Sequence, residues 1–293
     1  MNLSFDQLRL VEPLARFLED APIVDAHGIT IGWHSNVVGS NETALGSGFH
    51  ADRAISQRIA VAEVIERGLY RRISIDPSLS AQFLADEFPS SCGFAAGFDG
   101  HKTQGRAVAE ALERWAWSKW IDEGYTIPSI SQPNETVRPL RDHILKKFDS
   151  HRIFEREFKL EGGFDLPTDF KLTIILGFKD GGAFPGSRVS AIHEDATEHA
   201  AIEAWRHWII YKNLPDVDPG DLVNGRIHYF GSNASAAEKA VSMGRRSEWP
   251  QPRLRILKSM AVDLGGGLRV NLSRALCSDY SGWHEGDVNR FVY

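Results

Sequence analysis

The stretch Ala60-Val61-Ala62-Glu63-Val64-Ile65-Glu66-Arg67 returns almost unchanged as Ala107-Val108-Ala109-Glu110-Ala111-Leu112-Glu113-Arg114. Each copy follows a Gly-Phe step, Gly48-Phe49 before the first and Gly97-Phe98 before the second. A looser third copy reads Ala200-Ala201-Ile202-Glu203-Ala204-Trp205-Arg206. The sequence therefore predicts three helices that present glutamate, each with arginine close behind.

The spacing of these glutamates decides what they can do. Glu63 and Glu66 are three residues apart, as are Glu110 and Glu113, so each pair shares one stripe of its helix. Glu66 also projects close to the direction of Ile55, on the apolar side. A carboxylate in that position needs a partner, because burying it alone costs several kcal/mol.

Three interpretations of the glutamates remain open at this point. Arg67 and Arg114 are placed to form ordinary ion pairs with them, as is common on helices. Converging carboxylates instead usually hold a hard cation such as Mg²⁺, which recruits phosphate oxygens and so points to a nucleotide. A dinuclear carboxylate site is disfavoured, because it wants Glu-x-x-His, and Glu66, Glu113 and Arg206 occupy the third position instead.

The apolar pattern predicts the elements around these motifs. Spacing of three and four residues predicts helices over residues 52–72, 103–120, 194–212 and, more weakly, 137–147. Apolar runs predict strands over residues 170–178, 188–192, 226–230, 260–264 and 268–272, the first two forming a hairpin. We expect a single α/β (α+β) domain over residues 1–293, with helices packed on a largely antiparallel sheet.

Composition narrows the function classes. Apolar residues make up 42% of the 293 and charged residues 25%, which is ordinary for a globular protein. A net charge of −6 argues against duplex nucleic acid as a partner. The two cysteines, Cys92 and Cys277, form no CxxC motif, so a structural zinc site is not expected. No apolar stretch approaches the length of a membrane span, and we expect a cytoplasmic protein.

At these motifs the chain resembles the YcaO family, over roughly residues 23–277. Residues 46–67 look like the first glutamate motif of that family, residues 90–114 like the second, and residues 196–203 like the third. The resemblance implies a fold built around an ATP pocket, with ATP and Mg²⁺ as cofactors. It implies metal ligation by Glu63, Glu66, Glu110, Glu113 and Glu203. It adds ATP contacts from Arg67, Arg114, His199 and Arg206.

This sequence departs from the pattern of the family at several positions. Ser47 stands where a lysine is common, Ile59 where a serine is common, and Cys92 where asparagine is usual. His199 takes the place of an arginine, and Arg206 that of a glutamine. The segment before the first motif reads as core, without the usual opening strand signal.

The resemblance implies an enzyme that phosphorylates the oxygen of a peptide backbone amide. A nucleophile then attacks the amide carbon, giving an azoline (cyclodehydration), a thioamide (thioamidation) or an amidine in a ribosomally made peptide. The alternative is a degenerate, non-catalytic subunit that docks a leader peptide or a partner protein. The expected partners are a precursor peptide, a separate ubiquitin-activating-enzyme-like or TfuA-like protein, and further copies of this chain as a homo-oligomer.

Overall fold

The computed structural model describes residues 5–131, 138–161, 167–191, 196–213, 221–265 and 267–292. The chain divides into two compact units. Unit 1 comprises Met1–Val108 and Ile256–Ala275, and unit 2 comprises Ala109–Arg255 and Leu276–Tyr293. Helices and antiparallel sheets are mixed in the chain, which confirms the predicted α/β class.

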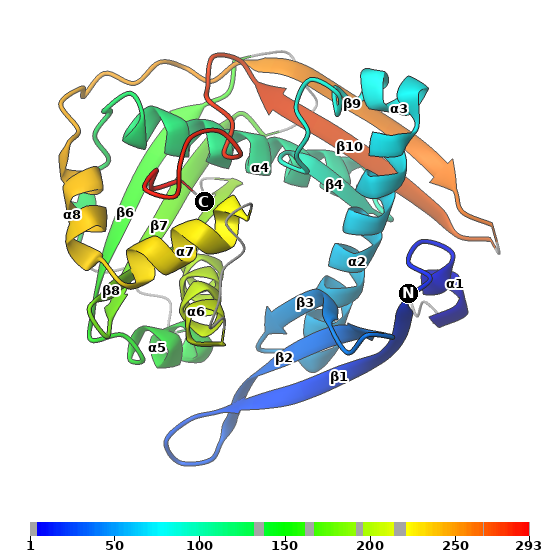
Figure 1. Ribbon diagram of the computed structural model, residues 1–293, viewed down its shortest axis with the longest axis horizontal. Helices are drawn as coiled ribbons and strands as arrows, with labels where there is room; N and C mark the ends of the chain where they lie inside the picture. The colour runs from blue at the N-terminus through cyan, green and yellow to red at the C-terminus, as the bar shows by residue number, and fades with distance from the viewer. Residues whose placement is uncertain are drawn as a thin grey trace. The chain divides into compact units, whose positions relative to one another are not determined.

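Unit 1 begins with the short helix α1 (Phe5–Arg9) and a three-stranded antiparallel sheet. Strands β1 (Ala15–Val24), β2 (Thr30–Gly39) and β3 (Ala44–His50) follow one another as a meander. The long helix α2 (Arg53–Ile75) then packs on β2 and β3 (Figure 1). This meander was not predicted, and the expected lack of an opening strand is wrong, because β1 is ten residues long.

Local chemistry explains where α2 begins and ends. The Asp52 carboxylate accepts a hydrogen bond from the backbone N–H of Ile55 and so caps the helix. Ala60, Val64 and Leu69 lie on its buried face. At the other end Asp76 leaves the helical conformation and caps the next helix, α3 (Pro77–Gln82). The predicted helix over residues 52–72 is therefore confirmed and extends one turn further.

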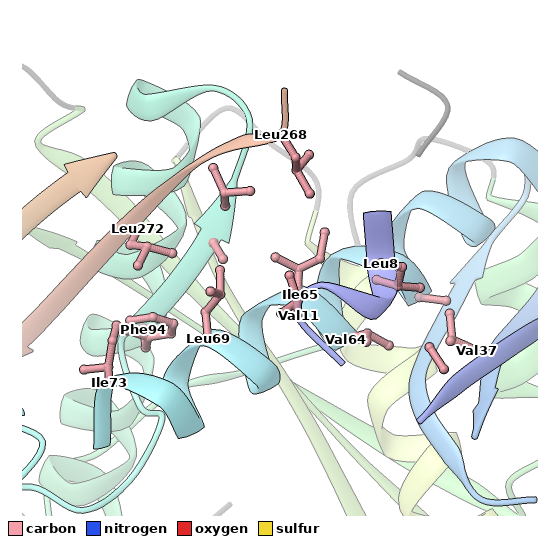
Figure 2. Packing of buried hydrophobic residues seen from close by; sticks show 14 of the residues in the cluster. Leu8, Val11, Val37, Val64, Ile65, Leu69, Ile73, Phe94, Leu268 and Leu272 are labelled. Carbon is pink, nitrogen blue, oxygen red and sulfur yellow. The ribbon is translucent and has the colours of Figure 1, made fainter. Parts of the chain in front are cut away.

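A second sheet completes unit 1. Strand β10 (Arg269–Cys277) lies between β4 (Phe94–Gly97) and β9 (Leu254–Asp263). Leu268, just before β10, and Leu272 within it join Val64, Ile65 and Leu69 of α2 in one apolar core, which Figure 2 shows from close by. The strands predicted at 260–264 and 268–272 are confirmed, although both are longer than expected.

Glycine permits the close approach of β3 to α2. A Cβ added at Gly48 would collide with the carbonyl oxygen of Ser56 and lie 2.8 Å from the backbone nitrogen of Ala60. Both of these atoms belong to the helix backbone, which cannot move aside cheaply. Gly48, in the Gly-Ser-Gly step of the first motif, therefore also allows β3 to pack closely on α2.

Gly48→Ala should destabilise unit 1 by about 2 kcal/mol, because the helix must shift away from the sheet. Urea unfolding measures this loss. Gly105→Ala is the matched control, because that helical glycine has open space around its Cβ position. The control should gain about 0.5–1 kcal/mol from helix propensity. Equal effects of the two substitutions would contradict the packing account.

Unit 2 is built on a four-stranded antiparallel sheet in the order β5-β6-β7-β8. Its strands are β5 (Ser129–Ile130), β6 (Ser150–Lys159), β7 (Asp169–Lys179) and β8 (Gly182–Ala191). Asp180 and Gly181 both have positive φ, as a two-residue Asp-Gly hairpin turn requires. The predicted hairpin is confirmed, with β8 starting earlier than expected; Ile192, its expected end, lies outside the described residues.

Helices pack against this sheet within unit 2. The helix α4 (Gly100–Ile121) begins in unit 1 and continues into unit 2, where Trp117 and Trp120 are buried. Helix α6 (Thr197–Asn213) packs on β7 and β8, and α5 (Pro139–Leu145) contacts α6 (Figure 1). The remaining helices are α7 (Leu222–Gly231) and α8 (Ala234–Ser242). The predictions for α4, α5 and α6 are confirmed, but residues 137, 194 and 195 lie outside the described residues.

One predicted strand is wrong. Residues 226–230 lie in α7, a helix that Asp221 caps by accepting a hydrogen bond from the backbone N–H of Asn224. Ile227 and Phe230 favour a strand by composition, but their spacing of three places both on the buried face of a helix. The helix cap and this spacing therefore outweigh the preference of Ile227 and Phe230 for a strand.

In the part of the chain that the structure describes, no helix is both long enough and apolar enough to cross a bilayer.

Candidate functional site

The first glutamate group belongs to α2 and lies in unit 1. Glu63 is half-buried, and its Oε2 atom accepts a hydrogen bond from the backbone N–H of Ser47 at 2.6 Å. Its Oε1 atom forms an ion pair with Arg67 at 2.5 Å. Glu63 is therefore anchored to strand β3 and carries its counterion one helical turn away.

Glu66 forms an ion pair that was not predicted from the sequence. Its Oε2 atom accepts from the guanidinium of Arg106, in the first part of α4, at 2.9 Å. The backbone N–H of Ala96 in β4 lies 3.4 Å from the same oxygen. The expectation that this half-buried carboxylate needs a partner is confirmed. Both glutamates of α2 thus have arginine counterions.

The second glutamate group lies in unit 2 and centres on Ser187 of β8. Glu113 is 6% exposed, and its Oε1 atom accepts from the Ser187 hydroxyl at 2.8 Å. Its Oε2 atom accepts from the backbone N–H of Val189 at 3.1 Å. Glu203 accepts from the backbone N–H of Ser187 at 2.7 Å. One serine therefore brings the carboxylates of α4 and α6 together.

Two carboxylates lie close to each other in a poorly solvated place. Burial, followed by the negative charge of Glu203, raises the pKa of the Glu113 carboxyl above its ordinary value. The positive charges of Arg114 and Arg188 and the hydrogen bond from Ser187 act in the opposite direction without cancelling the effect. A cation bound here would relieve the repulsion, so the donor set fits a hard ion such as Mg²⁺.

The remaining predicted site residues all lie in unit 2. Glu110, Arg114 and Arg206 are half-buried, and His199 is exposed on the first turn of α6. Within the described residues, no three Asp, Glu, His or Cys side chains gather closely enough to hold a metal ion by themselves. The assignment of five glutamates to one cation site stays a prediction.

The two groups share a pattern with a period of 140 residues. In each, a strand serine donates its N–H to a helix glutamate 16 residues later, Ser47 to Glu63 and Ser187 to Glu203. The preceding glycine, Gly46 or Gly186, touches the helix backbone at Ala60 or Ala200. In both units this helix follows three consecutive antiparallel strands.

The two groups differ in their counterions. The position equivalent to Arg67 is His207, whose Nδ1–H donates to the Pro185 carbonyl at 2.6 Å. Burial is the main cause that lowers the pKa of His207 to about 4, with the charges of Arg206 and Arg114 adding to it. His207 is therefore neutral at pH 7, and Glu203 lacks the cation that Glu63 receives at the same spacing.

A cavity of about 710 Å³ lies beside the first group, entirely within unit 1. Val61 and Ile65 of α2 contribute to its apolar wall. Arg58, Lys102 and Arg106 contribute cationic side chains. Its volume and mixed lining are those of a small-molecule site.

Sequence analysis missed Ser187, Arg106 and Lys102. The Gly-Ser step before the third glutamate lies at the same distance from it as the Gly-Ser step before the first, and this shared spacing was a usable signal for Ser187. Arg106 meets a glutamate 40 residues away, and no local pattern reports such a contact.

Ser187→Ala should cost unit 2 about 2 kcal/mol, because Trp117 donates to the same hydroxyl at 2.9 Å and Glu113 accepts from it. Both buried groups then lose a hydrogen-bond partner. Ser273→Ala is the control, since the hydroxyl of that buried serine has a single hydrogen-bond partner among the residues that the structure describes, the hydroxyl of Ser259. Urea unfolding of both variants tests this, and equal losses would contradict a special role for Ser187.

Comparison with known proteins identifies the fold of this chain. No protein-family model matches the chain, and no curated protein matches its sequence. Among solved structures, the E. coli microcin synthetase McbBCD complex matches with TM-score 0.64 and 11% identity, covering 90% of this chain and 88% of that one. The same complex with pro-MccB17 bound matches with TM-score 0.59 and 12% identity, covering 92% and 90%.

A third match is YcaO from Methanopyrus kandleri bound with AMPPCP and Mg²⁺, with TM-score 0.55 and 12% identity, covering 96% of this chain and 92% of that one. The two glutamate groups thus lie on a mixed α/β scaffold of known type. The chain has a YcaO-like fold, as the sequence motifs implied.

Proposed function

We propose that the chain uses Mg-ATP to activate a backbone amide of a ribosomally made peptide for cyclodehydration, thioamidation or amidine formation. The observation that carries the proposal is the Glu113–Glu203 pair on Ser187, two neighbouring carboxylates whose mutual repulsion a divalent cation would relieve. A similar fold binds AMPPCP and Mg²⁺, and another was solved with pro-MccB17, which supports a nucleotide and a peptide as ligands.

The side chains have separable roles in this proposal. Glu113 and Glu203 are the best-suited cation ligands, with Glu63, Glu66 and Glu110 as the further predicted ones. Arg67, Arg114, His199 and Arg206 are the predicted phosphate contacts. Mg-ATP, when bound, supplies the phosphoryl group that turns the amide oxygen into a leaving group. Units 1 and 2 would together form the single domain expected from the sequence.

A second function has its own support. The Glu63–Arg67 and Glu66–Arg106 ion pairs are complete without any metal, as expected of a subunit that does not turn over ATP. Such a subunit would dock a leader peptide or a partner protein. In both cases we propose that substrate capture involves a separate partner or a second copy of this chain.

Calorimetry with Mg-ATP, followed by phosphate release with a candidate precursor peptide and its partner protein, separates these functions. The enzyme should bind Mg-ATP, melt at a higher temperature in its presence, and release phosphate only when the peptide is added. Binding without phosphate release would favour the docking subunit. No binding and no melting shift at millimolar Mg-ATP would refute the enzyme.

A further inference from the structure

Strand β9 forms one edge of the sheet that it shares with β10 and β4 (Figure 1). Glu161 meets the chain at Arg253, just before β9, and within the described ranges no strand pairs with the outer side of β9. The strand has ten residues, which is long for an edge, and an exposed edge is a template for pairing with another strand. The outer side of β9 is therefore a candidate interaction surface.

The register of β9 on β10 shows which backbone groups point outward. The backbone N–H of Leu264, just after β9, donates to the Leu268 carbonyl at 2.8 Å. The hydroxyls of Ser259 and Ser273 lie 2.9 Å apart. Both pairs fit one antiparallel register, in which the even-numbered residues of β9 hydrogen-bond to β10. The N–H and C=O groups of the odd-numbered residues therefore point to the open edge.

The side chains of β9 alternate between two environments, with Leu257 as the exception. Met260 and Val262 pack against the apolar core of unit 1 and yet stay half-buried. Arg255 and Asp263 lie on the opposite face, near the two ends of the strand, and are exposed. A further strand along this edge would cover the half-buried apolar side chains, and that strand would need charges that match Arg255 and Asp263.

The sequence of β9 is complementary to itself in one antiparallel register. When Ser259 lies on a two-fold axis, Arg255 of each copy is opposite Asp263 of the other. This pairing uses the backbone groups of the odd-numbered residues, which are those at the open edge. Moving the axis to Lys258 would place two like charges opposite each other, and moving it to Met260 would separate Arg255 from Asp263.

We propose that two copies of this chain associate through their β9 strands in this register, so that the three-stranded sheets of both copies form one continuous sheet. Ile256, which is half-buried, then lies opposite Val262 of the second copy, and the apolar layer extends across the axis. Each contact occurs twice, so the interface closes on itself as a dimer. The inference does not depend on the nucleotide or the peptide of the proposed function.

Sedimentation velocity of the full chain measures this association, and we expect a dimer at micromolar concentration. Ser259→Cys tests the register, because the two residues on the axis form a hydrogen-bonded pair with Cα atoms about 5.5 Å apart, within the range of a disulfide. Oxidation should therefore join most of this variant into covalent dimers. Cys92 and Cys277 are buried and should give no background.

Ala261→Cys is the matched control for the cross-link. Ala261 is as exposed as Ser259, but its two copies would lie more than about 10 Å apart, so it should cross-link at least about tenfold more slowly. Equal cross-linking of the two variants would overturn the inference, and so would a wild-type chain that stays monomeric at about 100 μM.

A charge swap tests the contact between Arg255 and Asp263. Arg255→Asp and Asp263→Arg should each weaken the dimer by about tenfold, because each creates two like-charge contacts. The double variant should regain wild-type association within about threefold. Within one chain the two residues are about 26 Å apart along the extended strand, so rescue can arise only between copies. Both side chains are exposed, so the variants should fold, and circular dichroism checks this.

A double variant that associates no more tightly than the single ones would contradict the proposed register. Ala261→Pro, which removes one outward-pointing N–H, distinguishes a different occupant of the edge. It should weaken the dimer. If the wild-type chain is instead monomeric and Ala261→Pro weakens the binding of a candidate precursor peptide, the edge takes a peptide strand and the inference is wrong.

Discussion

Replacing Glu113 with glutamine should reduce peptide-dependent ATP turnover by about 100-fold or more while the protein stays folded. Glutamine keeps the size of the side chain but removes one negative charge from the proposed cation site. Losing a charged group that stabilises the transition state typically costs this much. Phosphate release under saturating Mg-ATP measures the effect, and the predicted ligand Glu110 should respond in the same direction to Glu110→Gln.

A second prediction for the Glu113→Gln variant concerns the stability of the fold. Burial and the charge of Glu203 raise the pKa of Glu113, so the charged form is disfavoured in the folded protein. Glutamine relieves this charge burial but can accept only one of the hydrogen bonds from Ser187 and Val189, so Glu113→Gln should change the free energy of unfolding at pH 7 by less than about 1 kcal/mol in the absence of ligand. Glu238→Gln, on the exposed side of α8, is the control and should alter neither quantity.

A structural role for Glu113 predicts the opposite outcome. If Glu113 serves chiefly as an ion-pair partner of Arg114, the glutamine variant should lose stability and keep its turnover. Measuring unfolding and phosphate release on the same preparation decides between the two roles.

Arg226→Ala should destabilise unit 2 by about 3–5 kcal/mol, the largest stability loss that we expect of any single substitution here. The side chain is fully buried in the middle of α7, a segment that was expected to be a strand. Its guanidinium donates to the backbone carbonyls of Trp283, Glu285, Asp287 and Val292, the last three at 2.7, 3.3 and 3.1 Å. One side chain therefore holds the C-terminal segment at four backbone positions.

Urea unfolding and limited proteolysis measure this effect. Cleavage within residues 283–292 should become faster, because Phe291 packs on Trp117 and Phe230 only while the segment is held. Arg226→Lys should recover a minor part of the loss, since an ammonium group cannot reach four carbonyls. Arg245→Ala is the control, because within the described ranges the hydrogen bonds of this exposed side chain go to the neighbouring carbonyls of Ser242 and Gly244; a similar loss there would contradict the anchoring role.

The parts of the fold that could be predicted from the sequence have strong local signals. Helix α2 combines an Asp52 cap with a regular apolar face, and the β7–β8 hairpin combines a buried run with an Asp-Gly turn. The β1–β3 meander has neither, because β1 is largely exposed and carries Glu19 and Asp20 among its apolar residues. Its strands are defined by pairing with one another, which composition does not reveal.

For the candidate site, too, the residues with a local sequence signal could be predicted and the others could not. The repeated motif identified Glu63, Glu66, Glu113 and Glu203, because each recurs at a fixed place on a helix. The groups that hold them come from elsewhere in the chain. Ser187 is 74 residues from Glu113, and Arg106 is 40 residues from Glu66, so these partners became visible only in three dimensions.

The period of 140 residues has an evolutionary consequence. A strand glycine, a strand serine and a helix glutamate that recur at the same spacing in both units are what tandem duplication of an ancestral gene segment produces. Selection then acted on each copy separately, and Arg67 in one corresponds to a neutral His207 in the other. The helix glutamate of the first copy therefore has an arginine counterion four residues later, whereas that of the second has a neutral histidine at the same position.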